Sequence, residues 1–183
     1  MFDELGFYSF ALQRVSPHFN ARPANASISL LVVHNISLPP GEFGHPYIDE
    51  LFMGTLDCQA HPFFRDLQGL RVSSHFLIRR DGQVVQYVST LSRAWHAGQS
   101  VFQGRTDCND FSIGIELEGT DRLPYSTDQY HSLVTLSRAI MHTYPAVTLG
   151  RIVGHTDIAP GRKTDPGVAF DWAGFRQRIR TEA

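Results

Sequence analysis

The chain has 183 residues, with 16 Lys or Arg and 18 Asp or Glu, so its formal charge is −2. Hydrophobic residues make up 42% and charged residues 19%, which is typical of a globular protein, and we expect a single domain over residues 1–183. No run of about 18 apolar residues occurs, so we expect no membrane partner. The chain has no Lys/Arg cluster, which argues against a nucleic-acid partner.

The N-terminal residues and the cysteines bear on the compartment. The chain starts with Met1, Phe2, Asp3 and Glu4, which are acidic where a secretory signal would be basic, so we expect a cytoplasmic protein. Two cysteines, Cys58 and Cys108, are too few for a disulfide framework, and we expect both to be free. We further expect a monomer.

The first half of the chain predicts a strand, a helix and a hairpin. Residues 28–34 are a short run rich in β-branched residues and leucine, which indicates a buried strand. A helix over 47–53 follows a proline and ends before a glycine. Residues 72–79 and 84–88 read as two strands, and the Asp81-Gly82 pair between them predicts a type I′ turn.

The second half predicts a central strand and two helices. Residues 111–118 alternate between apolar and polar, which is typical of a strand. A capping box starts an amphipathic helix over 126–144, and an aspartate caps a second helix that begins at Asp171. We therefore expect an α/β fold in which helices flank a mixed central sheet on the apolar face of 111–118. On the other face, Gly114 would leave space for a cleft.

Four long segments rich in Gly, Pro and polar residues separate these elements. Loops of this length inside a compact domain are usually functional, so we expect them to surround the active site. They cover residues 35–46, 55–70, 89–110 and 154–169.

The residue types of a metal site occur at two distant places. His34 ends the first predicted strand, where rigid backbone presents a side chain to a cleft. His155 and Asp165 lie on a later segment that is stiffened by prolines and also contains glycines. Two histidines and one carboxylate form a complete catalytic zinc set, which leaves a fourth position for water. On residue types alone, a metal site and an ordinary polar cleft are equally good interpretations.

Glu116 and Lys163 have side chains suited to the rest of a hydrolytic mechanism. A carboxylate beside a zinc-activated water can take its proton, and Glu116 on the polar face of the central strand suits this role. Lys163 could stabilise a developing oxyanion. The competing interpretations are a solvated glutamate, which would also describe Glu118, and an ordinary surface lysine.

Motifs at five places along the chain resemble those of one enzyme family, the 1,6-anhydro-N-acetylmuramyl-L-alanine amidases of the AmpD type. The resemblance runs from about residue 15 to residue 176, nearly the whole chain. Wider relatives are the zinc amidases that include peptidoglycan recognition proteins and the phage T7 lysozyme type. The motifs are VHNISLPPG (33–41), SHFLIRRDG (74–82), RAWHAG (93–98), NDFSIGIELEGT (109–120) and GHTDIAP with RKTDPG (154–160 and 162–167).

The resemblance implies a role for each candidate residue. His34, His155 and Asp165 match the family's zinc ligands, with one Zn²⁺ per chain, while Glu116 matches its catalytic carboxylate and Lys163 its transition-state stabiliser. An aspartate rather than a cysteine as third ligand indicates the AmpD-type branch. The implied reaction is hydrolysis of the amide between the lactyl group of anhydro-N-acetylmuramic acid and L-alanine of the stem peptide. This reaction serves peptidoglycan recycling, and in some organisms it keeps β-lactamase induction low.

Substrate contacts are predicted for three residues near these motifs. Trp95, on a loop next to a glycine, could stack on the sugar, although a core tryptophan is an equally good interpretation. Arg71 could pair with a stem-peptide carboxylate in a bidentate manner. Asn35, beside the first predicted ligand, could form a hydrogen bond with the peptide.

The chain departs from the family at one position that bears on peptide binding. Family members carry a basic residue where Asp107 stands, and Arg105 could substitute for it. His75 and His96 also resemble family positions, and we interpret both as structural.

A non-catalytic muropeptide-binding module is the alternative to a hydrolase. Such modules generally lack part of the metal set, whereas this chain has all three ligand candidates together with Glu116 and Lys163. The sequence therefore favours a zinc amidase. With a cytoplasmic location, its substrate would be an anhydro-muropeptide carried into the cell.

Overall fold

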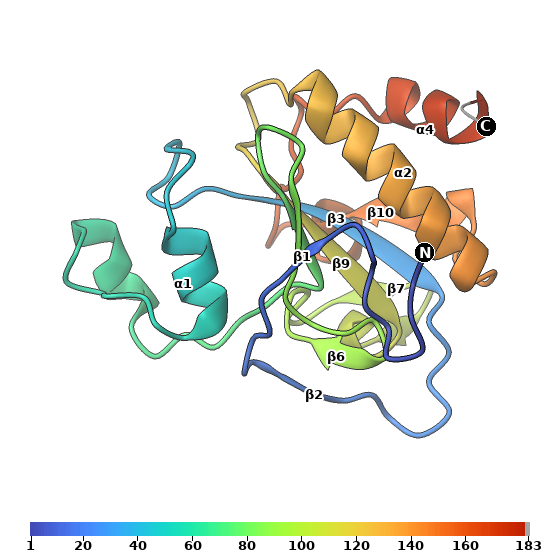
Figure 1. Cartoon of the computed structure of the whole chain (residues 1–183), viewed down its shortest axis with the longest axis horizontal. Helices are drawn as coiled ribbons and strands as arrows, with labels where there is room; N and C mark the ends of the chain where they lie inside the picture. The colour runs from blue at the N-terminus through green and yellow to red at the C-terminus, as the bar shows by residue number, and fades with distance from the viewer. Residues whose placement is uncertain (182–183) are drawn as a thin grey trace.

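The computed structural model describes residues 1–181 and contains a six-stranded sheet in the order β1, β5, β4, β9, β3, β10 (Figure 1). β4 and β5 are antiparallel, and every other neighbouring pair is parallel, so the sheet is mixed as predicted. The strands are β1 Leu12–Gln13, β3 Leu30–Ile36, β4 Phe76–Ile78, β5 Val84–Gln86, β9 Ser112–Glu118 and β10 Ile152–Gly154.

The three predicted helices form where their local signals place them. α2 (Thr127–Thr143) begins with the Ser126/Gln129 capping box, and α4 (Trp172–Thr181) begins where Asp171 accepts a hydrogen bond from the Gly174 amide at 2.9 Å. α1 (Tyr47–Met53) ends at Gly54, whose φ of 71° is the left-handed conformation that favours glycine. A further short helix, α3 (His155–Ile158), follows β10 directly. Among the described residues, no helix has the length and apolar character needed to cross a membrane.

One face of the sheet carries the main core. The alternate residues Ile113, Ile115 and Leu117 of β9 point toward α2 and α4, where they pack with side chains such as Leu133 and Phe175. Figure 1 shows α2 and α4 together over the sheet, and α1 at some distance from both. This is the predicted arrangement of helices on the apolar face of the central strand.

The opposite face is also largely buried, which differs from our expectation. α1 packs there against Leu77 and Tyr87, and a smaller cluster forms around Leu30, Val32 and Phe111. β9 is buried along its whole length because it is a central parallel strand covered on both sides. The space over Gly114 is not left for a cleft: the His96 ring fills it, since a Cβ on Gly114 would lie 2.5 Å from His96 Cγ.

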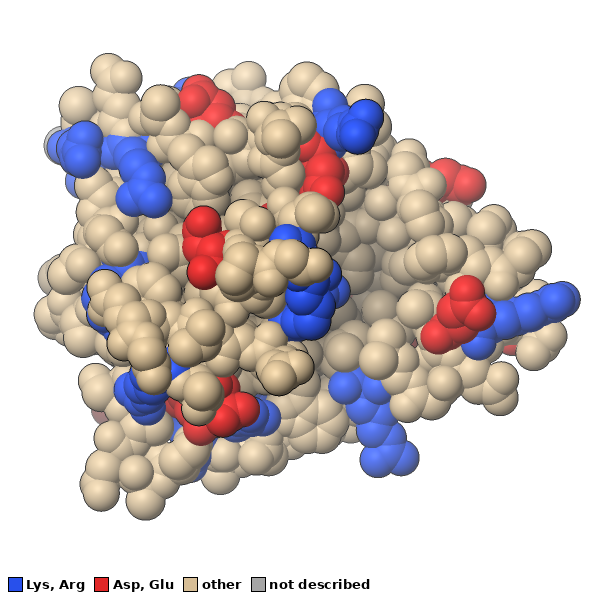
Figure 2. Space-filling view, turned by 180° about the vertical axis from the view of Figure 1, so that it is seen from behind, with Lys and Arg blue, Asp and Glu red and all other residues tan. Residues whose placement is uncertain are grey.

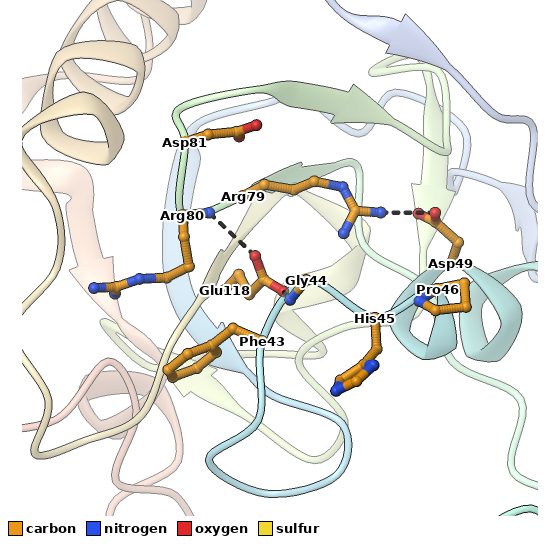
Figure 3. Close-up of a pocket in the computed structure, with 9 residues that line it drawn as sticks. All are labelled: Phe43, Gly44, His45, Pro46, Asp49, Arg79, Arg80, Asp81 and Glu118. Carbon is orange, nitrogen blue, oxygen red and sulfur yellow. Dashed lines mark hydrogen bonds and ion pairs between the residues drawn. The ribbon is translucent and has the colours of Figure 1, made fainter.

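Glu118 is not a solvated glutamate, because it is only 2% exposed. Its two carboxylate oxygens accept hydrogen bonds from the backbone amides of Gly44, at 2.7 Å, and Arg80, at 3.1 Å (Figure 3). Glu118 therefore joins the loop before α1 to the turn after β4.

The predicted hairpin is shorter than expected and has a different turn. Only Gly82 has a positive φ, 83°, whereas a type I′ turn would also require one at Asp81. The Arg79 amide donates to the Gln83 carbonyl, so three residues form the loop and glycine adopts its left-handed position. Short elements also occur in and before the predicted long loops: β2 Phe19–Ala21, η1 Pro62–Leu67, β6 Ser92–Ala94, β7 Val101–Phe102, β8 Arg105–Thr106, η2 Cys108–Asp110 and η3 Leu149–Arg151.

Candidate active site

The sheet places His34 and Glu116 side by side. β3 and β9 are parallel neighbours, and His34 is the register partner of Glu116. Both side chains lie on the face opposite α2, and His34 Nδ1 is 4.0 Å from Glu116 Oε1. His34 is 1% and Glu116 9% exposed, so the two groups form the floor of the site.

His155 and Asp165 reach the same point from the segment after β10. β10 pairs with β3, so the start of α3 brings His155 next to His34. The chain then folds back, and the Asp165 carbonyl accepts a hydrogen bond from the Thr156 amide at 3.0 Å. This contact brings the Asp165 carboxylate between the two imidazole rings.

The three predicted ligand atoms converge. His34 Nδ1 and His155 Nδ1 are 2.9 Å apart, and Asp165 Oδ2 lies 3.1 Å from the first and 3.0 Å from the second. His155 Nε2 donates to the Ala97 carbonyl at 3.0 Å, which leaves the Nδ1 lone pair of a neutral ring facing the other two atoms. Three such atoms turned toward one point form a group that can hold a metal ion.

The surroundings of His34 and Asp165 favour the protonation states that metal binding requires. Burial lowers the pKa of His34 to about 4, so its imidazole is neutral at pH 7. Burial alone would raise the pKa of Asp165, but in the zinc-free structure its contacts with the His155 and His34 rings outweigh burial and hold that pKa well below its ordinary value. Neutral histidines and an ionised carboxylate are the ligand forms that bind zinc.

Glu116 differs from Asp165 in its surroundings. Burial, together with the nearby Asp165 carboxylate, raises the pKa of Glu116 well above its ordinary value. Its Oε2 atom is buried and has no hydrogen-bond partner among the described residues. An unpaired carboxylate oxygen beside a metal-ligand group is a candidate proton acceptor.

These groups open into a cleft of about 380 Å³. One wall is apolar and comes from α1, the η1 segment and the residues after it. We did not identify it from the sequence, because no local signal in residues 51–72 indicates that they pack beside the ligand candidates. A second hollow of about 560 Å³ shares Asn35, Lys163 and Asp165 with the cleft. The apolar wall includes Leu51, Phe52, Phe63, Leu67, Leu70 and Val72.

Lys163 lines both hollows and is exposed. It is the only lysine in the sequence.

The rear face of the molecule is hollowed and carries acidic and basic side chains in a mixed pattern rather than a continuous basic surface (Figure 2).

The predicted substrate-contacting residues divide into two groups. Asn35 and Trp95 line the cleft. The Asn35 amide already donates to Asp121 at 2.9 Å and to the Pro166 carbonyl at 3.1 Å, so only its oxygen is available to a ligand. The Trp95 ring stacks on His18, and its Nε1 donates to Asn20 at 2.6 Å. Its ring is therefore a fixed part of the wall.

Arg71 and Arg105 lie outside this cleft. Arg71 lines an adjoining hollow that shares Leu67 and Leu70 with it. The Arg105 guanidinium lies 3.9 Å from the centre of the Phe111 ring, away from the described cleft residues. The structure therefore brings the ligand candidates, Glu116, Lys163, Asn35 and Trp95 together, places Arg71 next to them, and leaves Arg105 apart.

Comparison with known proteins gives consistent matches. The family profile of N-acetylmuramoyl-L-alanine amidase, Amidase_2, matches residues 24–168. The chain is 59% identical to the 1,6-anhydro-N-acetylmuramyl-L-alanine amidase AmpD of Escherichia coli K12, over 98% of this chain and 97% of that protein.

Two solved structures extend the match to the fold. A crystal structure of a selenomethionine AmpD derivative superposes with a TM-score of 0.94 at 56% identity, covering 98% of this chain and 99% of that one. The amidase AmiD from E. coli, in complex with anhydro-N-acetylmuramic acid-L-Ala-D-γ-Glu-L-Lys, has a TM-score of 0.62 at 31% identity, covering 86% of this chain and 60% of that one. The chain belongs to the N-acetylmuramoyl-L-alanine amidase family, and within it to the AmpD-like group.

Proposed function

We propose that this amidase hydrolyses the lactyl–L-alanine amide of 1,6-anhydro-N-acetylmuramyl peptides, with one Zn²⁺ held by His34, His155 and Asp165. The observation that carries the proposal is the convergence of three ligand atoms within 3.1 Å of one another beside the Glu116 carboxylate. The names of the AmpD relatives and the AmiD complex with an anhydromuramyl peptide support this substrate class.

The ligand group fits zinc. Tetrahedral ligands about 2.1 Å from a zinc ion lie about 3.4 Å from one another, so the observed spacing needs only a small outward movement. Neutral imidazoles and a carboxylate are also the donors that zinc takes in hydrolases. When bound, zinc would supply Lewis-acid chemistry by polarising the scissile carbonyl and making water more acidic.

Glu116 would transfer a proton from the attacking water to the leaving amine. Its Oε2 atom, which has no hydrogen-bond partner among the described residues, takes a proton from the attacking water and then returns it to the nitrogen of the leaving L-alanine. The raised pKa suits the first half of this task, because a carboxylate with a higher proton affinity is a stronger base toward the attacking water.

Lys163 and the cleft walls would hold the substrate. The Lys163 ammonium is exposed at the boundary of the two hollows, where it can stabilise negative charge on the carbonyl oxygen. Trp95 would contact the sugar and Asn35 the peptide through its free oxygen. Arg71 would pair with a carboxylate of the stem peptide, and Arg105 is retained as a more distant candidate for the same role.

Mass spectrometry of the products tests this function. Zinc-loaded protein incubated with an anhydro-muropeptide should yield anhydro-N-acetylmuramic acid and the free stem peptide, with one water added across the lactyl–alanine bond. A Glu116→Ala variant with bound zinc is the matched control, and we expect it to leave the substrate intact. If the unsubstituted protein binds both zinc and substrate but releases no peptide, the binding-module alternative is correct.

We place the reaction in the cytoplasm, on imported wall fragments, and we propose that the enzyme acts as a monomer. Cell fractionation should recover the protein with soluble cytoplasmic markers. Sedimentation of the purified protein should give the mass of one chain, 20.6 kDa.

A further inference from the structure

The second nitrogen of His34 has a partner that is not a predicted ligand. His34 Nε2 lies 2.9 Å from His96 Nδ1, and the rings meet edge to face at 84°. On the far side of its ring, His96 Nε2 lies 3.1 Å from the Ser112 hydroxyl. A continuous line of hydrogen bonds therefore runs from the ligand group through His96 to the start of β9.

Metal binding by His34 would determine which atom donates and which accepts in each of these hydrogen bonds. If His34 offers the Nδ1 lone pair to zinc, its proton is on Nε2, and His96 Nδ1 must accept it. A neutral His96 then carries its own proton on Nε2 and donates to the Ser112 oxygen. Ser112 suits the end of the line because its hydroxyl can accept as well as donate.

The fold fixes His96 in the place that this line requires. The ring occupies the space over Gly114, where a Cβ would approach Nδ1 to 2.6 Å. Its backbone is held as well, because the Asn109 side-chain oxygen accepts hydrogen bonds from the His96 amide at 3.1 Å and the Ala97 amide at 2.8 Å. Asn109 is itself buried, at 6% exposure. The contact with Gly114 on one side and the Asn109 hydrogen bonds to its backbone therefore hold the His96 ring next to His34, at the edge of the cleft.

We propose that His96 is a positioning residue that fixes the orientation and the tautomer of His34 for metal binding. The proposal rests on the proposed zinc site. Hydrogen-bond partners behind metal-ligating histidines typically change metal affinity by about 10- to 100-fold when they are lost. His155 has the Ala97 carbonyl in the corresponding place, so both imidazoles have an acceptor behind them.

The test is the zinc dissociation constant, measured by competition with a chelating indicator. His96→Phe keeps a ring of similar size but removes the acceptor, and we expect about 10- to 100-fold weaker zinc binding. His96→Asn retains an acceptor oxygen close to the Nδ1 position, and we expect it to recover part of this loss. Gly114→Ala, which pushes the ring out of place, should also weaken zinc binding while leaving His96 in the sequence.

His75→Phe is the matched control. His75 is a neighbouring buried histidine with its ring centre 5.7 Å from that of His96, but it accepts from the Gly114 amide and contacts the Ser92 carbonyl rather than a ligand. We expect a lower melting temperature for this variant and a zinc affinity within about threefold of the unsubstituted protein. Equal loss of zinc affinity in both variants would show a general effect of core disruption and would overturn the proposal.

A measurement on the unsubstituted protein covers the case in which His96→Phe does not fold. Two-bond ¹⁵N–¹H NMR of the zinc-loaded protein should show the proton on Nε2 in both His34 and His96. A proton on His96 Nδ1 would contradict the proposal. If the unsubstituted protein binds no zinc, the proposed function itself is wrong; if it binds zinc and His96→Phe binds zinc equally well, only the role of His96 is wrong.

Discussion

The burial of Glu116, the proposed proton acceptor, has a cost to stability. It is buried next to the Asp165 carboxylate, and both factors raise its pKa. In the unfolded chain a glutamate titrates at about 4.3. Between that pH and the raised value, the folded state holds a proton that the unfolded state has lost, so the stability of the zinc-free protein falls as the pH rises through this window.

Replacing Glu116 by glutamine should therefore separate stability from activity. We expect Glu116→Gln to lower kcat by about 10²- to 10⁴-fold, because the proton acceptor is gone. The zinc-free variant should melt at a higher temperature than the unsubstituted protein at pH 7, and the difference should disappear below about pH 4. Calorimetry across this pH range checks the prediction, and equal melting temperatures at pH 7 would contradict the raised pKa.

Lys163 offers a second prediction at a single residue. We expect Lys163→Met to lower kcat by about 100-fold or more, since it removes the charge that we propose stabilises the developing oxyanion, and Lys163→Arg to recover part of the loss. Zinc content and melting temperature should stay unchanged, because the side chain is exposed. Arg65→Met, an exposed cation outside the cleft lining, is the control. A similar loss in that variant would point to overall charge rather than to Lys163.

α1 depends on a buried polar contact for its position over the sheet. Asp49, near the middle of the helix, accepts a hydrogen bond from Arg79 at 2.7 Å (Figure 3). It accepts another from the Tyr87 hydroxyl. The next turn of the helix supplies Leu51 and Phe52 to the cleft wall. A contact that joins α1 to the hairpin thus also positions the apolar side of the active site.

Removing this contact should cost stability. We expect Asp49→Ala to lower the free energy of unfolding by about 3 kcal/mol, since it leaves the Arg79 guanidinium and the Tyr87 hydroxyl without their buried acceptor. Urea denaturation measures the change. Asp66→Ala, at an exposed position, should change the free energy by less than about 0.5 kcal/mol. Equal values for the two variants would show that Asp49 does not anchor the helix.

At the scale of the whole molecule, the site is formed by three adjacent strands and the segment that follows them. His34 comes from β3, Glu116 from β9, and His155 and Asp165 from the chain after β10. A zinc ion held by His34, His155 and Asp165 would join β3 to the segment after β10 in the folded state alone, so its binding would stabilise the fold.

Zinc removal should accordingly lower the melting temperature. At a free zinc concentration of about 100 times its dissociation constant, binding contributes about 2.7 kcal/mol, which for a domain of this size corresponds to about 5–10 °C. Calorimetry with chelator and with added zinc measures this shift. Asp165→Ala should show little or no zinc-dependent shift, and a full shift in that variant would exclude Asp165 from the ligand set.

Local signals in the sequence were enough to locate α1, α2 and α4, whereas α3 lies in a segment that was predicted to be a loop. Ser126 with Gln129 and the cap at Asp171 act within one turn of backbone, so they have the same effect in any fold. The types of residue needed for a zinc hydrolase were likewise visible, because metal chemistry restricts which side chains can serve. Strands of two or three residues, such as β1 and β10, were missed because pairing with a neighbour is what makes them strands.

Spatial relations between distant segments were decided only by the tertiary structure. The burial of Glu118, the His96 ring over Gly114 and the apolar wall from α1 each join residues that are far apart in the chain. Periodicity describes one element at a time and carries no information about which other element covers it. The candidate ligand set could therefore be proposed from the sequence, whereas its hydrogen-bonded support and the shape of its cleft depend on how the sheet is packed.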